Sequence, residues 1–181
     1  MNFTIRDATP DDAQAIAAIY AHYVLTSCAT FEETPPEAAE MRSRMQDVLR
    51  AGLPYFIAET PGSGIAGYGY ASAFHRRAGY RWTLEDSVYV RAGVTGQGIG
   101  TALLRALLAA TEKRGYRKMV AVIGDSDNEA SIRLHARVGF ERSGFLPAAG
   151  FKLGRWVDVV QMQLPLGDGA RSVPSDLDIG R

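Results

Sequence analysis

Apolar and polar positions follow two spacings along this chain, a period of two residues and a period of three to four. Alternation over two residues is typical of a half-buried β-strand, and the longer spacing is typical of an amphipathic helix. Alternating or continuous apolar runs bounded by turn residues predict seven strands, at residues 3–6, 55–58, 65–74, 82–90, 119–123, 140–146 and 156–164.

Four segments between these strands have helical spacing. Residues 9–12 (TPDD) begin the first, with threonine as N-cap and proline in the first turn, and residues 34–37 (TPPE) begin the second as a capping box. The third follows from Thr101 to Gly115, and the fourth covers residues 128–138. This order predicts an α/β (α+β) fold, with a mixed central sheet of about seven strands and helices on both faces.

The chain divides into one predicted domain and a tail. Residues 1–166 are enough for a single substantial core, whereas residues 167–181 lack an apolar period and are rich in Gly, Ser and Asp, which predicts disorder. No apolar run approaches the roughly 20 residues that cross a membrane, and no signal-peptide pattern opens the chain. We therefore expect no membrane partner.

Composition narrows the function further. The chain has 20 basic and 20 acidic residues, and this neutrality argues against nucleic-acid binding. Cys28 is the only cysteine, so we expect a small buried apolar residue and a reducing, cytoplasmic location. The three histidines have no metal-ligand spacing, so no metal is predicted.

Residues 88–100 (VYVRAGVTGQGIG) carry the strongest chemical signal, because a strand there turns through three glycines into a helix. Such a turn leaves backbone N–H groups at the positive end of the helix dipole, where a phosphate or diphosphate binds. The structural alternative is a tight strand-to-helix turn without a ligand. We predict a phosphate-bearing cofactor between this strand and this helix.

Three known glycine patterns compete for the loop. A Walker loop requires a lysine, which is missing, and the spacing of Gly96, Gly98 and Gly100 does not fit the dinucleotide fingerprint. The third pattern, Q/R-x-x-G-x-G/A, is the acetyl-CoA loop of the GCN5-related N-acetyltransferases (GNAT). Residues 95–100 match it at both glycines, with Thr95 in place of the usual Gln or Arg.

Longer strings make this resemblance more specific. Residues 82–90 (WTLEDSVYV), 120–123 (VAVI) and 149–158 (AGFKLGRWVD) resemble the phosphinothricin and methionine sulfoximine acetyltransferases of the GNAT superfamily. The resemblance covers nearly the whole chain apart from the tail. It implies acetyl-CoA as cosubstrate, a sheet splayed at the cofactor site, and a homodimer.

The resemblance also implies which residues hold the cofactor. The loop and the following helix are expected to bind the pyrophosphate, and the preceding strand to pair with the pantetheine arm. Asn128 matches an asparagine that touches this arm, although it is equally suited to be a helix N-cap. The expected contacts are Val88, Tyr89, Val90, Thr95, Gly96, Gln97, Gly98, Ile99, Gly100 and Asn128.

Acetyl transfer to an amine needs a general base, and Glu85 is the candidate. Alternation places it in a polar row with Thr83, Ser87 and Tyr89. A row of this kind usually faces solvent, but in the resembling enzymes the matching glutamate is the proposed base. Burial would raise the pKa of its carboxyl toward neutrality.

The neighbouring Asp86 interrupts an apolar alternation that includes Leu84 and Val88. A β-bulge would explain this interruption. It would also free a backbone N–H near Val88 to stabilise an oxyanion.

His135 is the second catalytic candidate. It stands where many members of the superfamily carry a tyrosine that resembles a general acid for the leaving thiolate. Histidine exchanges protons near pH 7, so it suits this role or a proton relay. A structural hydrogen bond within the helix is the equal alternative.

The basic connection before the fourth strand is expected to meet the substrate. Arginine binds carboxylate or phosphinate oxygens bidentately, and in the resembling enzymes the segment matching residues 75–77 contacts substrate. A solvated loop is the alternative. Phe31 suits either an apolar wall or, more simply, a core position. The predicted substrate residues are His75, Arg76, Arg77, Glu85, Asp86 and Ser87.

Together these features predict a cytoplasmic N-acetyltransferase. It would move acetyl from acetyl-CoA to the α-amine of a small amino acid or analogue by direct attack, with Glu85 as base. One alternative acts on protein N-termini or other amines. Another is a non-catalytic acyl-CoA-binding module.

Overall fold

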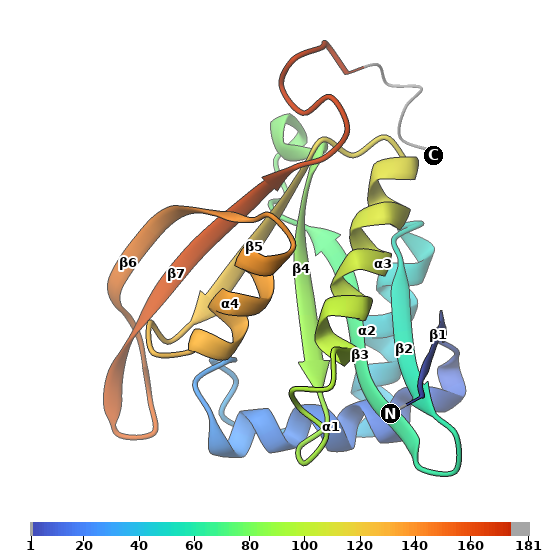
Figure 1. Cartoon of the computed structure of the whole chain (residues 1–181). Coiled ribbons are helices and arrows are strands. Elements are labelled where there is room, and N and C mark those ends of the chain that lie inside the picture. The colour runs from blue at the N-terminus through green and yellow to red at the C-terminus, as the bar shows by residue number, and fades with distance from the viewer. Residues whose placement is uncertain (1, 175–181) are drawn as a thin grey trace.

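The computed structural model describes residues 2–174, which form one mixed sheet in the order β1-β2-β3-β4-β5-β7-β6 (Figure 1). Within it only β4 and β5 run parallel, and every other neighbouring pair is antiparallel. The strands are β1 (Thr4–Asp7), β2 (Tyr55–Thr60), β3 (Gly64–Ala73), β4 (Thr83–Val90), β5 (Lys118–Gly124), β6 (Glu141–Lys152) and β7 (Arg155–Pro165). The predicted fold class is confirmed.

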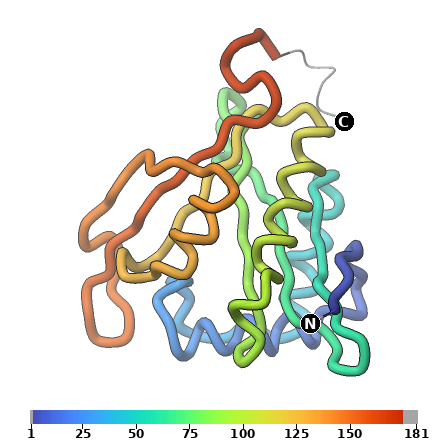
Figure 2. Tube along the Cα trace, viewed as in Figure 1, coloured from blue at the N-terminus to red at the C-terminus, as the bar shows by residue number. Residues whose placement is uncertain are grey.

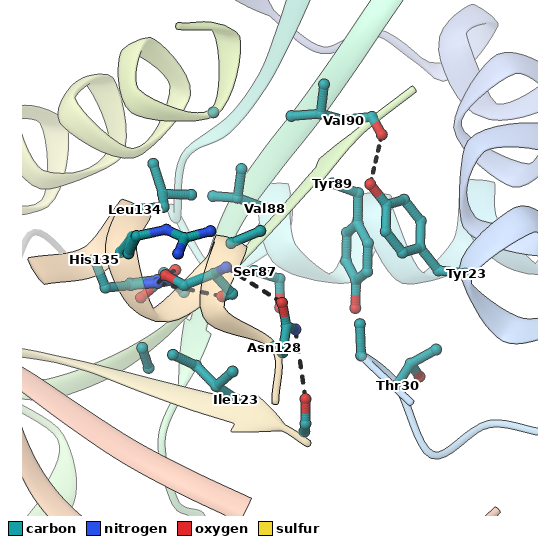
Figure 3. A pocket seen from close by; sticks show the side chains of 18 of the residues that line it. Tyr23, Thr30, Ser87, Val88, Tyr89, Val90, Ile123, Asn128, Leu134 and His135 are labelled. Carbon is teal, nitrogen blue, oxygen red and sulfur yellow. Dashed lines mark hydrogen bonds and ion pairs between the residues drawn. The ribbon is translucent and has the colours of Figure 1, made fainter. Parts of the chain in front are cut away.

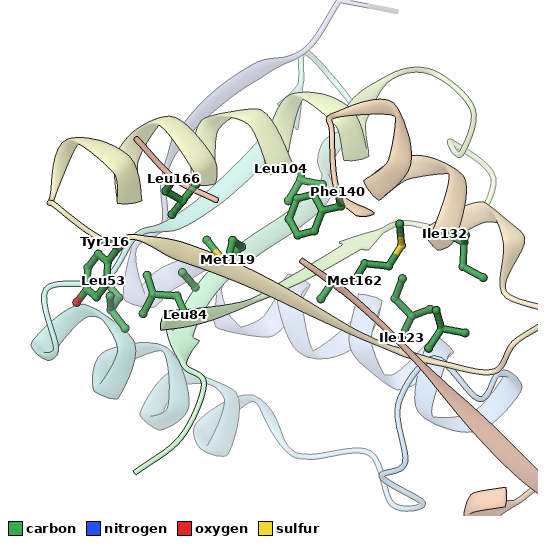
Figure 4. Close-up of a cluster of buried hydrophobic side chains, with 13 residues drawn as sticks. Leu53, Leu84, Leu104, Tyr116, Met119, Ile123, Ile132, Phe140, Met162 and Leu166 are labelled. Carbon is green, nitrogen blue, oxygen red and sulfur yellow. The ribbon is translucent and has the colours of Figure 1, made fainter. Parts of the chain in front are cut away.

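Helices cover both faces of this sheet. Helices α1 (Ala13–Thr26) and α2 (Ala38–Arg50) pack on one face, where Met45, Ile57 and Tyr68 form part of the core. Helices α3 (Ile99–Lys113) and α4 (Glu129–Arg137) pack on the other face over a second cluster (Figure 4). Alternation along each strand therefore decides which helix layer a side chain meets.

The predicted start of the second helix is wrong. Helix α2 begins at Ala38 with Glu37 as its extended N-cap, and no side chain caps it. The two prolines of residues 34–37 are the reason, because each proline disfavours helical geometry at the residue before it. The first helix does begin at the predicted place, as a 3₁₀ turn (Pro10–Asp12) in which Asp12 accepts a bond from the Thr9 N–H at 2.7 Å.

Of the other boundaries that differ from the prediction, two bear on the surroundings of the glycine loop and the last hairpin. Helix α3 begins at Ile99 rather than Thr101, because Gly98 adopts a left-handed conformation (φ 83°) and turns the chain directly into the helix. Strand β6 continues to Lys152, beyond the predicted end at residue 146, and pairs with β7 into a long hairpin.

Strands β4 and β5 pair over three residues and then separate. Their last pair is Glu85 with Val120. Beyond it β4 stays with β3 as far as Val90, and β5 stays with β7 as far as Gly124. Figure 1 shows the two strands diverging toward the bottom of the view. The splayed sheet that the resemblance implied is confirmed.

The expected β-bulge at Asp86 is wrong. The register between β3 and β4 is unbroken from Leu84 to Val90. Asp86 therefore points to the same buried face as Leu84 and Val88. A regular strand accommodates a buried acid there because His135 hydrogen-bonds to it.

The chain beyond β7 folds back on the domain. Residues 167–172 form turns and a bend (the dark red part of the trace in Figure 2), and Arg117 donates to the Ser172 hydroxyl at 3.0 Å. Residues 175–181 lie outside the described residues, so disorder there and the boundary at residue 166 stay predictions. No helix within residues 2–174 is long and apolar enough to cross a membrane.

Candidate active site

A cavity of about 620 Å³ lies where β4 and β5 part (Figure 3). Its walls come from distant parts of the sequence: residues 28–31 after α1, residues 85–90 of β4, the glycine loop, residues 121–124 of β5, and α4. A volume of this size suits a small-molecule site. The splay therefore creates a pocket in the middle of the sheet.

The glycine loop presents backbone donors to this cavity. The first hydrogen bond of α3 runs from the Ala102 N–H to the Gly98 carbonyl at 3.0 Å, and no side chain caps the helix. The N–H groups of residues 99–101 precede that bond, so they have no acceptor within the helix. They lie at the positive end of the helix dipole beside the cavity, which suits the diphosphate of coenzyme A.

The edge of β4 offers a second set of backbone groups. The Arg91 N–H bonds to the Ala66 carbonyl of the β3 segment, and alternation then turns Val88 and Val90 toward the gap left by β5. Tyr23 of α1 donates its hydroxyl to the Val90 carbonyl at 2.5 Å. The amide and carbonyl of Val88 face the gap, where an extended ligand can pair with them as an added strand.

Asn128 is the N-cap of α4, one of its two predicted roles. Its Oδ1 accepts from the Ser131 N–H at 3.2 Å, and its Nδ2 donates to the Gly124 carbonyl at 3.4 Å. It also lines the cavity. Contact between Asn128 and the cofactor arm stays a prediction.

Glu85 lies where the two strands part, half-buried at the cavity wall. Tyr89 of the same row packs in the core beneath α1 and α2, so Glu85 and Ser87 face that layer. Burial, and then the negative charge of Asp86, raise the pKa of the Glu85 carboxyl to about 7. A carboxyl with a pKa near neutrality is suited to take a proton from an amine at physiological pH.

Asp86 and His135 form a buried pair on the opposite face of β4. The imidazole Nε2 lies 3.0 Å from Asp86 Oδ2, with side chains only 5% and 1% exposed. Nδ1 lies 2.8 Å from the Ser131 carbonyl, which accepts only, so Nδ1 carries a proton. Burial lowers the pKa of His135, but the hydrogen bond and charge of Asp86 and the Ser131 carbonyl outweigh it and raise the pKa above its usual value.

This pairing leaves no ring nitrogen of His135 free. The group that does remain open is Asp86 Oδ1, which is buried beside the cavity and has no hydrogen-bond partner within residues 2–174. Figure 3 shows His135 at one side of the cavity and Thr30 at the other. The structural alternative for His135 thus has direct support from the geometry.

The basic connection is not brought into the cavity. His75, Arg76 and Arg77 are exposed and do not line it. The His75 ring packs against Tyr80 at 4.9 Å, and its Nδ1 accepts from the Arg77 N–H at 3.1 Å. Gln97 of the glycine loop also lies outside the cavity lining.

The residues after α1 contribute more than expected. Phe31 is 42% exposed and forms part of the cavity wall, so the simpler expectation of a core position is wrong. Cys28 is buried, as predicted. Tyr23 and Thr30 also line the cavity, and the sequence did not predict this. Their positions on and after a helix do not indicate that they pack beside a strand about 60 residues further along the chain.

Comparison with known proteins identifies the class of enzyme. The acetyltransferase (GNAT) family matches residues 16–140. The phosphinothricin N-acetyltransferase of Alcaligenes faecalis is 50% identical over 94% of this chain and 86% of its own length. The L-methionine sulfoximine/L-methionine sulfone acetyltransferase of Pseudomonas aeruginosa is 41% identical over 96% of this chain and all of its own.

A solved structure agrees with these relatives. The phosphinothricin acetyltransferase of Sinorhizobium meliloti, in complex with acetyl-CoA, superimposes with a TM-score of 0.93 at 44% identity, covering 97% of this chain and 95% of the other. This chain therefore belongs to the GNAT acetyltransferase family. It is an acetyl-CoA-dependent N-acetyltransferase, which sets aside the non-catalytic module.

The Asp86–His135 pair predicts a pH-dependent stability. Because the folded-state pKa of His135 is raised above 6.5, its stabilisation is fully present below 6.5 and is lost as the pH rises through the folded-state value. We expect Asp86→Asn to lower the free energy of unfolding by about 3 kcal/mol near pH 6 and by less near pH 9. Urea unfolding at the two pH values measures this.

The exposed Asp47 of α2, which pairs with Arg50, provides the matched control. Asp47→Asn should change the free energy of unfolding little, and equally at both pH values. An Asp86→Asn effect that grew with pH would contradict the raised pKa.

Proposed function

We propose that this enzyme acetylates the α-amine of a small amino acid or amino acid analogue of the phosphinothricin or methionine sulfoximine/sulfone type. The observation that carries the proposal is Glu85, a half-buried carboxyl with a pKa of about 7 at the point where β4 and β5 part. The names of the relatives support the substrate class.

Different groups of the chain are proposed to bind the cofactor and to receive the amine. Acetyl-CoA supplies the acetyl thioester. We propose that the glycine loop, residues 95–100, and the start of α3 bind its diphosphate, and that Val88 to Val90 pair with its pantetheine arm. Glu85 and Ser87 face the α1 layer, so the amine is expected to approach from that side.

Glu85 then acts as the general base. Its carboxylate takes a proton from the bound ammonium, which restores the nitrogen lone pair. The amine attacks the thioester carbonyl carbon, and the carbon–sulfur bond breaks. The sulfur leaves as a thiolate, which takes up the second proton that the attacking nitrogen loses as it becomes the amide. No covalent bond to the enzyme forms, so no nucleophilic side chain is needed.

His135 was the candidate acid for the departing thiolate. We propose that it acts from its present place, by holding Asp86 at the cavity wall, since both ring nitrogens already have partners. Direct proton donation to the sulfur would require the Asp86 bond to break first. The raised pKa of His135 keeps a proton available for either event.

Recognition of an acidic acceptor by the basic connection stays a prediction from the sequence, because its residues are exposed and lie outside the cavity lining. His75, Arg76 and Arg77 lie in the connection that leads into β4, and arginine binds carboxylate and phosphinate oxygens bidentately. Asp86 and Ser87 complete the predicted substrate set. The cytoplasmic location and the absence of nucleic-acid, membrane and metal partners stay predictions from the sequence.

Substituting the base tests this function directly. Glu85→Gln should lower kcat by about 10²-fold or more, because the amide cannot accept the proton. In the wild-type enzyme, kcat/KM should rise with pH through an apparent pKa near 7, as Glu85 deprotonates. Release of free thiol from acetyl-CoA measures both, with phosphinothricin, methionine sulfoximine, methionine sulfone, common amino acids and a short peptide as acceptors.

Glu59→Gln is the matched control, because Glu59 lies on β2 and pairs with Arg6 away from the cavity. It should leave the pH profile unchanged. Wild-type turnover in Glu85→Gln would remove this residue from the base role, and acetylation of the peptide alone would favour the N-terminal acetyltransferase alternative.

The glycine loop predicts a separate effect on cofactor affinity. Gly98 has φ 83°, and an L-residue there costs roughly 1–2 kcal/mol and tilts the donors at the start of α3. We expect Gly98→Ala to weaken coenzyme A binding by about tenfold in titration calorimetry, a loss of roughly 1.4 kcal/mol. Gly62→Ala, with φ 73° in the β2–β3 turn and open space around it, should add similar strain without changing the affinity. Equal affinities in the two variants would contradict the diphosphate site.

We also propose that the enzyme is a homodimer, as the resemblance implies. The β6–β7 hairpin exposes Phe145, Leu146, Phe151, Leu153 and Trp156, each close to half or more exposed. An apolar patch of this kind marks an interaction surface.

Light scattering should give twice the mass of the 19.6 kDa chain. Trp156→Ser should shift the measured mass toward that of the monomer, whereas Leu25→Ser on α1 should leave the mass unchanged. A wild-type monomer would contradict the proposal.

A further inference from the structure

The wall of the cavity on the acceptor side is the segment after α1, residues 27–33, which we call the acceptor loop. Residues 28–31 line the cavity. The loop follows α1, and Glu85 and Ser87 face the α1 layer of the sheet. The side chains of Thr30 and Phe31 therefore border the space in which an amine would reach Glu85.

Lys152 holds this loop from more than 100 positions away in the chain. Its side chain comes from the end of β6, and the residue is only 3% exposed. The Nζ donates to the Ser27 carbonyl at 2.8 Å and to the Thr30 carbonyl at 2.7 Å. These two carbonyls are three residues apart in the loop, so a single ammonium links the two positions.

The partners of this cation are unusual. A buried ammonium normally pairs with a carboxylate, because leaving water is costly. Here its hydrogen bonds go to backbone carbonyls, and Glu32 and Glu33 act on it only through their charge. Burial lowers the pKa of Lys152. The ammonium of Lys152 therefore fixes the backbone of the acceptor loop and does not form an ion pair through a hydrogen bond.

Two glycines bring the loop into close contact with the strands behind it. A Cβ on Gly150 of β6 would lie 3.0 Å from the ring of Phe31, and a Cβ on Gly124 of β5 would lie 2.2 Å from the Cys28 carbonyl. The β6–β7 hairpin and β5 therefore form the surface on which the loop is seated. Figure 2 shows the blue segment after α1 beside the lower end of the hairpin.

From the other side, the loop is tied to the α-helical layer. The Tyr20 hydroxyl lies 2.7 Å from the Thr30 hydroxyl and donates to Glu32 at 3.0 Å. Arg44 of α2 donates to the same carboxylate at 2.6 Å. Helices α1 and α2 thus hold the side chains of Thr30 and Glu32, and Lys152 holds the backbone of the loop beside the cavity.

We propose that Lys152 is a positioning residue for acceptor specificity, which sets the place of Thr30 and Phe31 through its two carbonyl bonds. It contacts neither the expected diphosphate site nor Glu85, so its effect should fall on the amine and not on acetyl-CoA. The proposal rests on the proposed function for its kinetic consequence. The pinning of the loop is separate from that function and can be measured alone.

The test is Lys152→Met, which keeps the length of the side chain and removes the charge and both bonds. We expect the KM for the best amine acceptor to rise roughly ten- to a hundredfold, because a misplaced wall misaligns the amine. The KM for acetyl-CoA should stay within about twofold. Hydrogen exchange of the backbone amides of residues 27–33 should become faster while that of β4 and α3 does not.

Lys118→Met is the matched control, because the Lys118 Nζ also makes a cross-strand bond, to Gln163 at 3.0 Å, outside the cavity. It should change neither KM nor exchange in the loop. Gly150→Ala tests the same wall with Lys152 intact, since the added methyl displaces the Phe31 ring. It should also raise the amine KM selectively.

The outcomes separate cleanly. An unchanged amine KM in Lys152→Met, or an equal rise in both KM values, overturns the positioning role. Should Lys152→Met fail to fold, Gly150→Ala still tests whether the place of Phe31 sets the amine KM, and an unchanged amine KM in that variant overturns the proposal. If no amine in the acceptor panel is acetylated by the wild-type enzyme, the proposed function fails, and unchanged exchange in residues 27–33 would then overturn the pinning itself.

Discussion

The early end of the pairing between β4 and β5 is the constraint on which the rest of the structure depends. After Glu85 and Val120 neither strand supplies the other with hydrogen-bond partners, yet each remains held on its far side by β3 or β7. Backbone groups at such an edge need partners, and water or an extended ligand must supply them. The two halves of the sheet thus stay fully paired on their far sides, with a cavity between them. The free N–H groups at the start of α3 lie beside this cavity.

The two carboxylates of β4 show how one strand serves two faces. Glu85 and Asp86 are adjacent, so alternation sends them to opposite sides of the sheet. Asp86 meets His135 in the α4 layer and gains a hydrogen-bond partner for one oxygen. Glu85 faces the cavity beneath α1, where burial and the charge of Asp86 raise its pKa to about 7. Burial, and then the charge of Asp86 on the other face of the strand, therefore raise the proton affinity of Glu85 on the side proposed for the acceptor.

The side of the cavity proposed for the acceptor depends on contacts between elements far apart in the chain. Lys152 and Gly150 reach the loop after α1 from the hairpin, while Tyr20 and Arg44 hold it from the helices. The side proposed for the diphosphate is built locally, from one strand, one loop and one helix. Short-range geometry therefore sets the proposed cofactor site, whereas long-range packing sets the proposed acceptor wall.

The sequence by itself determined the elements, their order and the glycine loop, because strand and helix spacings and glycine positions are local properties of the chain. It also pointed to Glu85 and His135 through their resemblance to a family. It was wrong about the bulge at Asp86, it left open whether Phe31 forms an apolar wall or packs in the core, and it gave no role to Tyr23 or Lys152. Each of these depends on a partner between about 50 and 125 positions away. Only the tertiary structure decided these four placements. A buried charge or an exposed ring is tolerated only when suitable groups pack against it, and those groups come from distant parts of the chain.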